Sequence, residues 1–211
     1  MKKRITALGL LWCLSAVMLQ AARVDTVLVR SVAMNKDVKV VYVLPDKAIG
    51  KQACPVVYLL HGYGGNAKTW IGVKPDLPQI ADEKGIIFVC PDGKNSWYWD
   101  SPKDPSYRYE TFVSSELVKY IDGHYKTIAG RKGRAITGLS MGGHGAMWNA
   151  IRHKDTFGAG GSTSGGVDIR PFPLNWDMSK QLGEFAYNKK VWDEHTVINQ
   201  IDKIENGDLA I

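Results

Sequence analysis

The chain has 211 residues, of which 45% are hydrophobic, 23% charged and 10% aromatic. This composition is that of an ordinary globular domain and excludes disordered, collagen-like and coiled-coil proteins. The formal net charge is +6, but three of the cations are Lys2, Lys3 and Arg4 at the N-terminus. Beyond residue 22 no run of Lys or Arg exceeds two residues. A nucleic-acid partner is therefore not expected.

Residues 1–22 have the layout of a secretory signal peptide, with a basic start, the apolar stretch 5–19 and two alanines before Arg23. The apolar stretch is shorter than the roughly 20 residues that span a bilayer. We therefore predict cleavage near Ala22, a secreted or periplasmic protein without stable membrane insertion, and one domain over residues 23–211. Cleavage removes three cations and lowers the net charge from +6 to +3. A retained N-terminal anchor is the alternative, because neither Leu19 nor Gln20 is a small residue.

Two cysteines, Cys54 and Cys90, follow the leader, and an exported protein with two cysteines invites a disulfide. Cys54 precedes the apolar run 55–60 (PVVYLL), whereas Cys90 ends the run 86–90 (IIFVC). On neighbouring parallel strands these positions lie at opposite ends, roughly 16 Å apart. A disulfide needs Cα atoms within about 7 Å. We therefore predict two buried thiols.

Hydrophobic patterning predicts a single α/β domain. Residues 24–30 and 37–44 alternate apolar and polar side chains, which indicates an antiparallel hairpin with one wetter face. The continuous apolar runs 55–60, 86–90 and 135–139 are typical of strands buried on both faces. A sixth strand is predicted to start near Phe157 and Ala159. Helical segments separate the runs, which is the order of a mostly parallel sheet with helices on both faces.

Four helices are expected. Residues 109–125 place Val113, Leu117 and Ile121 on one face and Ser114 on the other. A shorter helix over 77–84 ends at a glycine, Gly85, as helices commonly do. A third helix begins after Ser140, and the spacing of apolar residues predicts a peripheral helix over 191–204.

The segment 138–142 (GLSMG) matches G-x-S-x-G, with an apolar strand before it and a helix-capable segment after it. The turn between strand and helix is so sharp that bulky side chains two positions from the serine would collide. This context predicts that Ser140 is a nucleophile, with its Oγ at the positive N-terminal end of the next helix. The alternative is that Gly and Ser merely form a loop.

The segment 61–65 (HGYGG) follows the run 55–60, where this kind of hydrolase places part of its oxyanion hole. Two backbone N–H donors would stabilise the negative charge of a tetrahedral intermediate. The amide of Met141 is one expected donor, and that of Tyr63 or of a neighbouring glycine is the other. The alternative is a plain strand-ending turn. His61 is expected to hold the loop by hydrogen bonds rather than to act as a base.

Together, residues 59–70 (LLHGYGGNAKTW), the helix ending at Tyr125 and residues 134–147 (RAITGLSMGGHGAM) resemble the esterase D-like branch of the α/β-hydrolases. That branch includes S-formylglutathione hydrolases, feruloyl and acetyl-xylan esterases and mycolyltransferases. The resemblance covers residues 55–165. It implies an α/β-hydrolase sandwich, Ser140 as nucleophile, Tyr63 and Met141 as oxyanion donors, and an ester or thioester substrate. No His, Cys or Asp pair has metal-ligand spacing on a recognisable element, so we expect neither metal nor cofactor.

A serine nucleophile also needs a base and an acid, which follow it in the order Asp or Glu and then His in this fold. After Ser140 the only histidines are His144, His153 and His195, and none occupies the expected place. His195 is the best alternative base, since three acids precede it in the correct order: Asp168, Asp177 and Asp193. Residues 209–211 resemble the opening of a strand. We therefore hypothesise an N-terminal fragment whose last strands and triad Asp and His lie beyond Ile211, with little or no activity of its own.

Aromatic residues cluster after the run 86–90, at Trp97, Tyr98, Trp99, Tyr107 and Tyr109. This loop leaves the carboxyl end of a parallel strand, the edge at which α/β sheets bind ligands. Trp97 and Trp99 are therefore candidate substrate-binding residues, and packing of a long loop is the alternative.

The function that these features predict is a secreted serine esterase working through an acyl-enzyme on Ser140, with acyl groups on plant polysaccharide among its substrates. The alternatives are an acyltransferase of the same fold, in which a sugar hydroxyl replaces water, and a catalytically incomplete carbohydrate-binding protein. The expected partner is a small or polysaccharide-linked ester.

Overall fold

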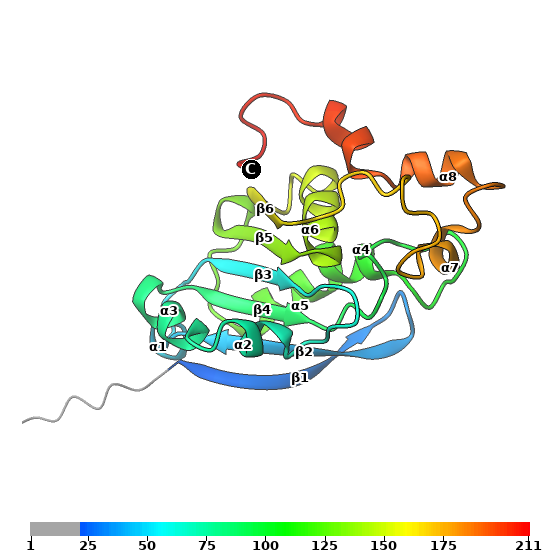
Figure 1. Cartoon of the computed structure of the whole chain (residues 1–211). Coiled ribbons are helices and arrows are strands. Elements are labelled where there is room, and N and C mark those ends of the chain that lie inside the picture. Colours follow the sequence, from blue (N-terminus) through cyan, green and yellow to red (C-terminus); the bar gives the residue numbers. More distant parts are fainter. Residues whose placement is uncertain (1–21) are drawn as a thin grey trace, which may run out of the picture.

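The computed structural model describes residues 22–211, so the predicted leader lies outside the described residues except for Ala22. One six-stranded sheet forms the centre, in the order β1-β2-β4-β3-β5-β6 (Figure 1). The strands are β1 (Arg23–Ser31), β2 (Lys36–Leu44), β3 (Val56–Leu60), β4 (Ile87–Pro91), β5 (Arg134–Leu139) and β6 (Ala159–Thr163). β1 and β2 form the predicted antiparallel hairpin, and β4, β3, β5 and β6 run parallel. The α/β-hydrolase topology of the sheet thus follows the predicted strands.

Helices cover both faces of the sheet (Figure 1). α2 (Thr69–Val73) and α3 (Leu77–Lys84) lie on one face, and α4 (Tyr109–Thr111), α5 (Leu117–His124) and α6 (Met141–Arg152) lie on the other. A single turn, α1 (Asp46–Ile49), follows β2, while α7 (Met178–Leu182) and α8 (Lys189–Glu194) lie beyond the carboxyl ends of the parallel strands. Successive side chains along the strands point to opposite faces of the sheet and so contribute to two hydrophobic cores. Val41 faces α3, and its neighbour Val40 faces α5 and α6.

Two helices differ from their predictions. Residues 112–116 form a π-helical turn between α4 and α5, and its wider turn rotates the buried face, so Ser114 is buried rather than exposed. The expected helix 191–204 is also wrong as one element. It is divided into α8 and the 3₁₀ helix Val197–Lys203 by Thr196, whose backbone is extended. The Oγ1 of Thr196 donates to the carbonyl of Trp192 at 2.7 Å, just after α8 ends at Glu194.

Cys54 and Cys90 are free and buried, as predicted. The register pairs Val56 with Ile87, which places one thiol before β3 and the other near the end of β4. Burial raises the pKa of the Cys90 thiol to about 12, so this sulfur stays protonated.

Residue 210 returns to the free edge of β6, where Ala210 pairs with Ala159 in a parallel bridge. The N–H of Gly160 donates to the Ala210 carbonyl at 2.8 Å, and the N–H of Ala210 donates to the Gly158 carbonyl at 3.1 Å. The expected start of a strand at 209–211 is thus confirmed as a bridge, whereas the strands predicted beyond Ile211 stay a prediction. Among residues 22–211, no helix is long and apolar enough to cross a bilayer.

Candidate active site

Ser140 occupies the sharp turn between β5 and α6 with φ 54° and ψ −117°, a backbone conformation that non-glycine residues rarely adopt. Its side chain is exposed, whereas Met141 next to it is fully buried. The glycines permit this turn because the backbones nearly touch. A Cβ on Gly142 would lie 2.2 Å from the Leu60 carbonyl oxygen, and a Cβ on Gly138 would lie 2.2 Å from the Gly142 carbonyl oxygen. The motif therefore has the geometry of a nucleophile elbow.

The loop after β3 packs directly against this elbow, since a Cβ on Gly62 would lie 3.5 Å from the Ser140 Cβ. His61 at its start is fully buried. The N–H of Gly93 donates to His61 Nε2 at 2.9 Å, so Nδ1 carries the proton and donates to the Gly62 carbonyl at 2.7 Å. His61 thus ties the loop to the end of β4, the structural role expected for it.

The two amides expected to form an oxyanion hole belong to these touching segments. Within residues 22–211, the backbone N–H groups of Tyr63 and Met141 have no hydrogen-bond partner. The Met141 amide is at the first position of α6, where no intrahelical acceptor exists. Unpaired amides beside an exposed serine are what an oxyanion hole requires, so both stay candidate donors.

Ser140 opens into a cavity of about 230 Å³ with aromatic walls. The walls come from the loop after β3, from Trp97 and largely from the segment 164–178, of which only Asp168 and Asp177 were considered above, as acids for His195. The residues that line it are Tyr63, Trp97, Ser140, Ser164, Gly166, Asp168, Ile169, Phe172, Trp176 and Met178. Phe172 and Trp176 are each more than 40% exposed, so this wall is also part of the rim.

The two candidate tryptophans have different positions. Trp97 lines the cavity, and its Nε1 donates to the Trp176 carbonyl at 3.2 Å. Trp99 is fully buried and stacks on the far side of Trp97, with ring centroids 5.6 Å apart. Direct contact with a ligand in the cavity is therefore open to Trp97, while Trp99 supports it from behind.

The side chain of Tyr63 closes one side of the cavity by a hydrogen bond to Asp177, with 2.7 Å between Oη and Oδ2. Lys180 pairs with the other oxygen of Asp177 at 2.9 Å. The bonds from Lys180 and Tyr63 lower the pKa of Asp177, and the same contact with Asp177 raises the pKa of Tyr63. Trp176 and Asp177 both have positive φ, 52° and 56°, so this turn before α7 is strained where it meets Tyr63.

His144 and His195 do not reach Ser140. Burial lowers the pKa of His144 to about 4, and its Nδ1 donates to the Gly166 carbonyl at 2.7 Å. His195 donates to the Val191 carbonyl at 2.7 Å, stacks on Trp148 and lines a different cavity. Of the acids considered as its partners, Asp168 and Asp193 pair with Arg170, and Asp177 pairs with Tyr63 and Lys180. In the described part of the chain, the alternative base His195 is thus not brought together with the serine.

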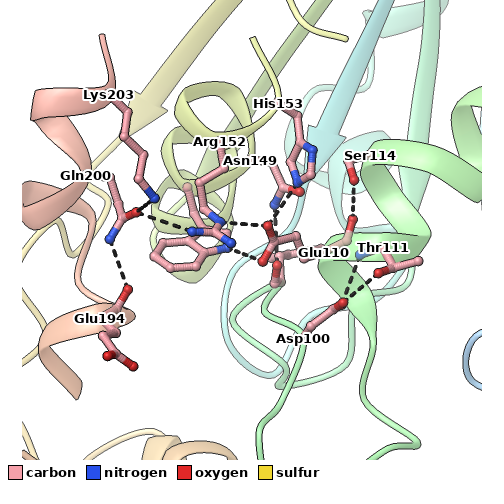
Figure 2. Close-up of polar contacts among 12 residues, drawn as sticks. Asp100, Glu110, Thr111, Ser114, Asn149, Arg152, His153, Glu194, Gln200 and Lys203 are labelled. Carbon is pink, nitrogen blue, oxygen red and sulfur yellow. Dashed lines mark hydrogen bonds and ion pairs between the residues drawn. The ribbon is translucent and has the colours of Figure 1, made fainter. Parts of the chain in front are cut away.

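A buried carboxylate, Glu110, anchors the far side of α6 (Figure 2). It accepts hydrogen bonds from Trp148 Nε1 at 2.8 Å, Arg152 Nε at 2.7 Å and His153 Nε2 at 2.9 Å. Burial raises the pKa of Glu110, but these bonds outweigh it and lower the pKa to about 2. No sequence motif marks Glu110, although its spacing of three and seven residues from Val113 and Leu117 places a charge on an apolar helix face.

The fold and the elbow together define an α/β-hydrolase. The model of the esterase family, described as "Putative esterase", matches residues 31–208, so the chain belongs to that family. Among residues 22–211, no group of three or more potential metal-ligating side chains lies together.

Sequence relatives are esterases and antigens of the same family. An esterase of Mycobacterium tuberculosis is 28% identical over 169 residues, which are 72% of this chain and 36% of that protein. The MPT51/MPB51 antigen of Mycobacterium bovis is 34% identical over 149 residues, or 69% of this chain and 46% of that protein. The chain thus spans between about a third and a half of these curated relatives.

Solved structures have the same fold. A ferulic acid esterase superposes with a TM-score of 0.71 and 27% identity, covering 89% of this chain and 74% of that one. An S-formylglutathione hydrolase from Staphylococcus aureus superposes with a TM-score of 0.75 and 19% identity, covering 90% and 76%. The predicted branch and fold class are thereby confirmed.

Proposed function

We propose that the protein is a serine carboxylic-ester hydrolase with Ser140 as its nucleophile. The observation that carries this proposal is the strained, exposed Ser140 between two segments whose amides, Tyr63 and Met141, are unpartnered. The Oγ bonds to the acyl carbon, the carbonyl electron pair moves onto oxygen, and the two amides stabilise that charge. The intermediate then expels the alcohol, which takes up a proton. Water next attacks the acyl-enzyme and releases the acid.

The proton transfers need a base. Since no histidine of residues 22–211 lines the Ser140 cavity, the hypothesis that the triad Asp and His lie beyond Ile211 is kept as part of the proposal. We also propose that the protein is exported, because residues 1–22 have the layout of a signal peptide.

The acyl group that we propose is aromatic. The Ser140 cavity is larger than the roughly 150 Å³ that admits a benzene ring. Its walls hold Tyr63, Trp97, Phe172 and Trp176, whose faces can stack on a phenolic ring. The similarity to a ferulic acid esterase at 27% identity supports the same substrate class. Aromatic acyl groups on plant polysaccharide belong to this proposed class.

An acyltransferase remains the second candidate, because the exposed Phe172 and Trp176 at the rim offer a face on which an acceptor sugar can stack in place of water. Product analysis separates the two reactions, since transfer yields a new ester whereas hydrolysis yields free acid.

Labelling with a fluorophosphonate tests the nucleophile. The protein with any residues that follow Ile211, and residues 23–211 alone, are each compared with their Ser140→Ala variants. We expect labelling of Ser140 in the longer protein and its loss in the variant. An absence of labelling in both chains would favour a carbohydrate-binding protein without catalysis.

Residues 23–211 are also assayed with p-nitrophenyl acetate. Turnover at an ordinary enzyme rate, lost in His195→Ala, would contradict the hypothesis that the acid and base lie beyond Ile211.

A further inference from the structure

A second cavity of about 320 Å³ adjoins the Ser140 cavity. The wall between them is the hydrogen bond from Tyr63 to Asp177, since Tyr63 lines the first cavity and Asp177 lines the second. Met178, the next residue, again lines the first cavity. The second cavity is lined by Gly64, Gly65, Lys94, Asn95, Tyr107, Asp177, Lys180 and Gln181. Because this bond is exposed and Tyr63 is 39% exposed, a molecule bound at Ser140 reaches the second cavity over the outer side of the bond.

Side chains around the second cavity present free donors, while most of their acceptors are occupied. Lys94 Nζ makes one contact, with Asp92 at 2.8 Å, and Lys180 Nζ makes one contact, with Asp177 at 2.9 Å. Each ammonium has three N–H donors, so two remain on each. The Oδ1 of Asn95 already accepts the N–H of Gly64 at 2.9 Å, which leaves the amide NH₂ of Asn95.

The charged side chains around the second cavity also favour an anionic ligand. The side chain of Asp92 is 9% exposed, whereas those of Lys94 and Lys180 are 60% and 71% exposed, so the ammonium ends are the accessible partners. Among the residues that line this cavity, two cations, Lys94 and Lys180, stand against one carboxylate, that of Asp177.

We propose that the second cavity binds the alcohol half of the ester, and that this alcohol carries a carboxylate. The inference rests on the proposed function, because Ser140 must attack the ester whose acyl half lies in the first cavity and whose alcohol half lies in the second. The aromatic cavity then holds the acyl group. Lys94 and Lys180 bind the carboxylate of the leaving group. Hydrolysis consumes water and releases the aromatic acid and a hydroxy acid, whose new hydroxyl has taken up the proton.

Binding tests the subsite without turnover. 4-Hydroxybenzoate and 4-hydroxybenzamide differ at the carboxylate alone, and each is titrated calorimetrically into the protein. We expect the carboxylate to bind about tenfold more tightly, with a preference that shrinks as salt screens the lysines. Lys94→Gln and Lys180→Gln should each reduce the preference several-fold. The control is Lys132→Gln, an exposed lysine just before the amino end of β5, at the opposite edge of the sheet.

Equal binding of the two compounds, or an equal loss in Lys132→Gln, would overturn the subsite. Turnover provides the second readout. We compare kcat/KM for 4-acetoxybenzoate with kcat/KM for its methyl ester. Each value is divided by the rate constant for alkaline hydrolysis of that ester, which corrects for their different intrinsic reactivity. The carboxylate ester is expected to be favoured, again through Lys94 and Lys180. These assays use the protein with any residues that follow Ile211. Turnover without this preference overturns the subsite alone, whereas a binding preference without turnover of either ester contradicts the proposed esterase.

Discussion

The Oη of Tyr63 donates to the Oδ2 of Asp177 at 2.7 Å and joins the loop after β3 to the turn before α7. One end of this link carries a proposed oxyanion donor, the Tyr63 amide. The other end is a strained turn that Lys180 also holds. The side chain of Tyr63 therefore restrains the position of its own backbone N–H.

Removing this restraint should slow the proposed reaction. Tyr63→Phe deletes the hydroxyl but keeps the ring, and we expect kcat to fall about tenfold, less than the 100-fold or greater loss when an oxyanion donor is removed outright. Asp177→Asn keeps an acceptor and should lose less. Tyr187→Phe, at a tyrosine that is 84% exposed, is the matched control. Steady-state kinetics on aryl acetates measure kcat and KM. A change confined to KM would contradict a positioning role for the Tyr63 hydroxyl.

Gly142 should not tolerate a methyl group. In Gly142→Ala the new Cβ would meet the Leu60 carbonyl oxygen at 2.2 Å, so β3 and the elbow must move apart. We expect a loss of roughly 1–3 kcal/mol in the free energy of unfolding and loss of phosphonate labelling. Gly123→Ala is the control, because nothing lies within 4 Å of its Cβ and a helical alanine should add about 0.4–1 kcal/mol. Urea denaturation followed by circular dichroism compares the two variants.

The two tryptophans should separate selectivity from stability. Trp97→Ala enlarges the Ser140 cavity and is expected to lower the ratio of feruloyl to acetyl ester turnover. Trp99→Ala removes a fully buried ring outside the cavity lining and should cost roughly 3–5 kcal/mol of unfolding free energy with little change in that ratio. Unchanged selectivity in Trp97→Ala would show that Trp97 only packs the loop.

The buried His144 should weaken the fold in mild acid. Its folded pKa of about 4 lies below the usual 6.5, so the unfolded chain binds the proton first as the pH falls. Stability is therefore complete above pH 6.5 and declines toward pH 4, by roughly 3 kcal/mol at most. NMR of the imidazole Cε1–H should show no titration between pH 7 and 5. A midpoint near 6.5 would contradict its burial.

Protonation of Glu110 should dominate the loss of folding stability below pH 4.5. Its folded pKa of about 2 lies below the usual 4.5, so the stabilisation is present above pH 4.5 and is lost as the pH falls toward 2. Glu110→Gln leaves Arg152 and His153 without their carboxylate and should cost about 1–3 kcal/mol at pH 7. The variant should also flatten the acid limb of a plot of unfolding free energy against pH. An acid limb identical to that of the wild type would exclude Glu110 as its source.

Much of the sheet could be predicted from the sequence, because residues 55–60, 86–90 and 135–139 are short apolar runs next to unambiguous turns. The position of Ser140 at the elbow could also be predicted, since a sharp turn between strand and helix leaves no room for side chains at Gly138 and Gly142. These signals are local, and each is complete within a few residues.

The remaining features depend on contacts between distant segments. Asp177 reaches the site only through a bond to a residue 114 positions earlier, and no periodicity in 164–178 predicts that this segment forms a cavity wall. The π-helical turn before α5 contains a bond from the Ser114 Oγ to the Glu110 carbonyl, and helix propensity does not predict such a turn. The break after α8 similarly lies at a single extended residue, Thr196, inside a segment whose apolar spacing predicts one continuous helix.

The sequence separation between Tyr63 and Asp177 also has a kinetic meaning. The loop after β3 can meet the elbow as soon as β3 and β5 pair, but its side-chain restraint waits for a segment that follows β6 in the chain. Contacts of such long range carry a large loop-closure cost and form late in folding. The sheet should therefore gain amide protection before the cavity closes, and a refolding chain should pass through a stage that has its elbow but not yet a finished pocket.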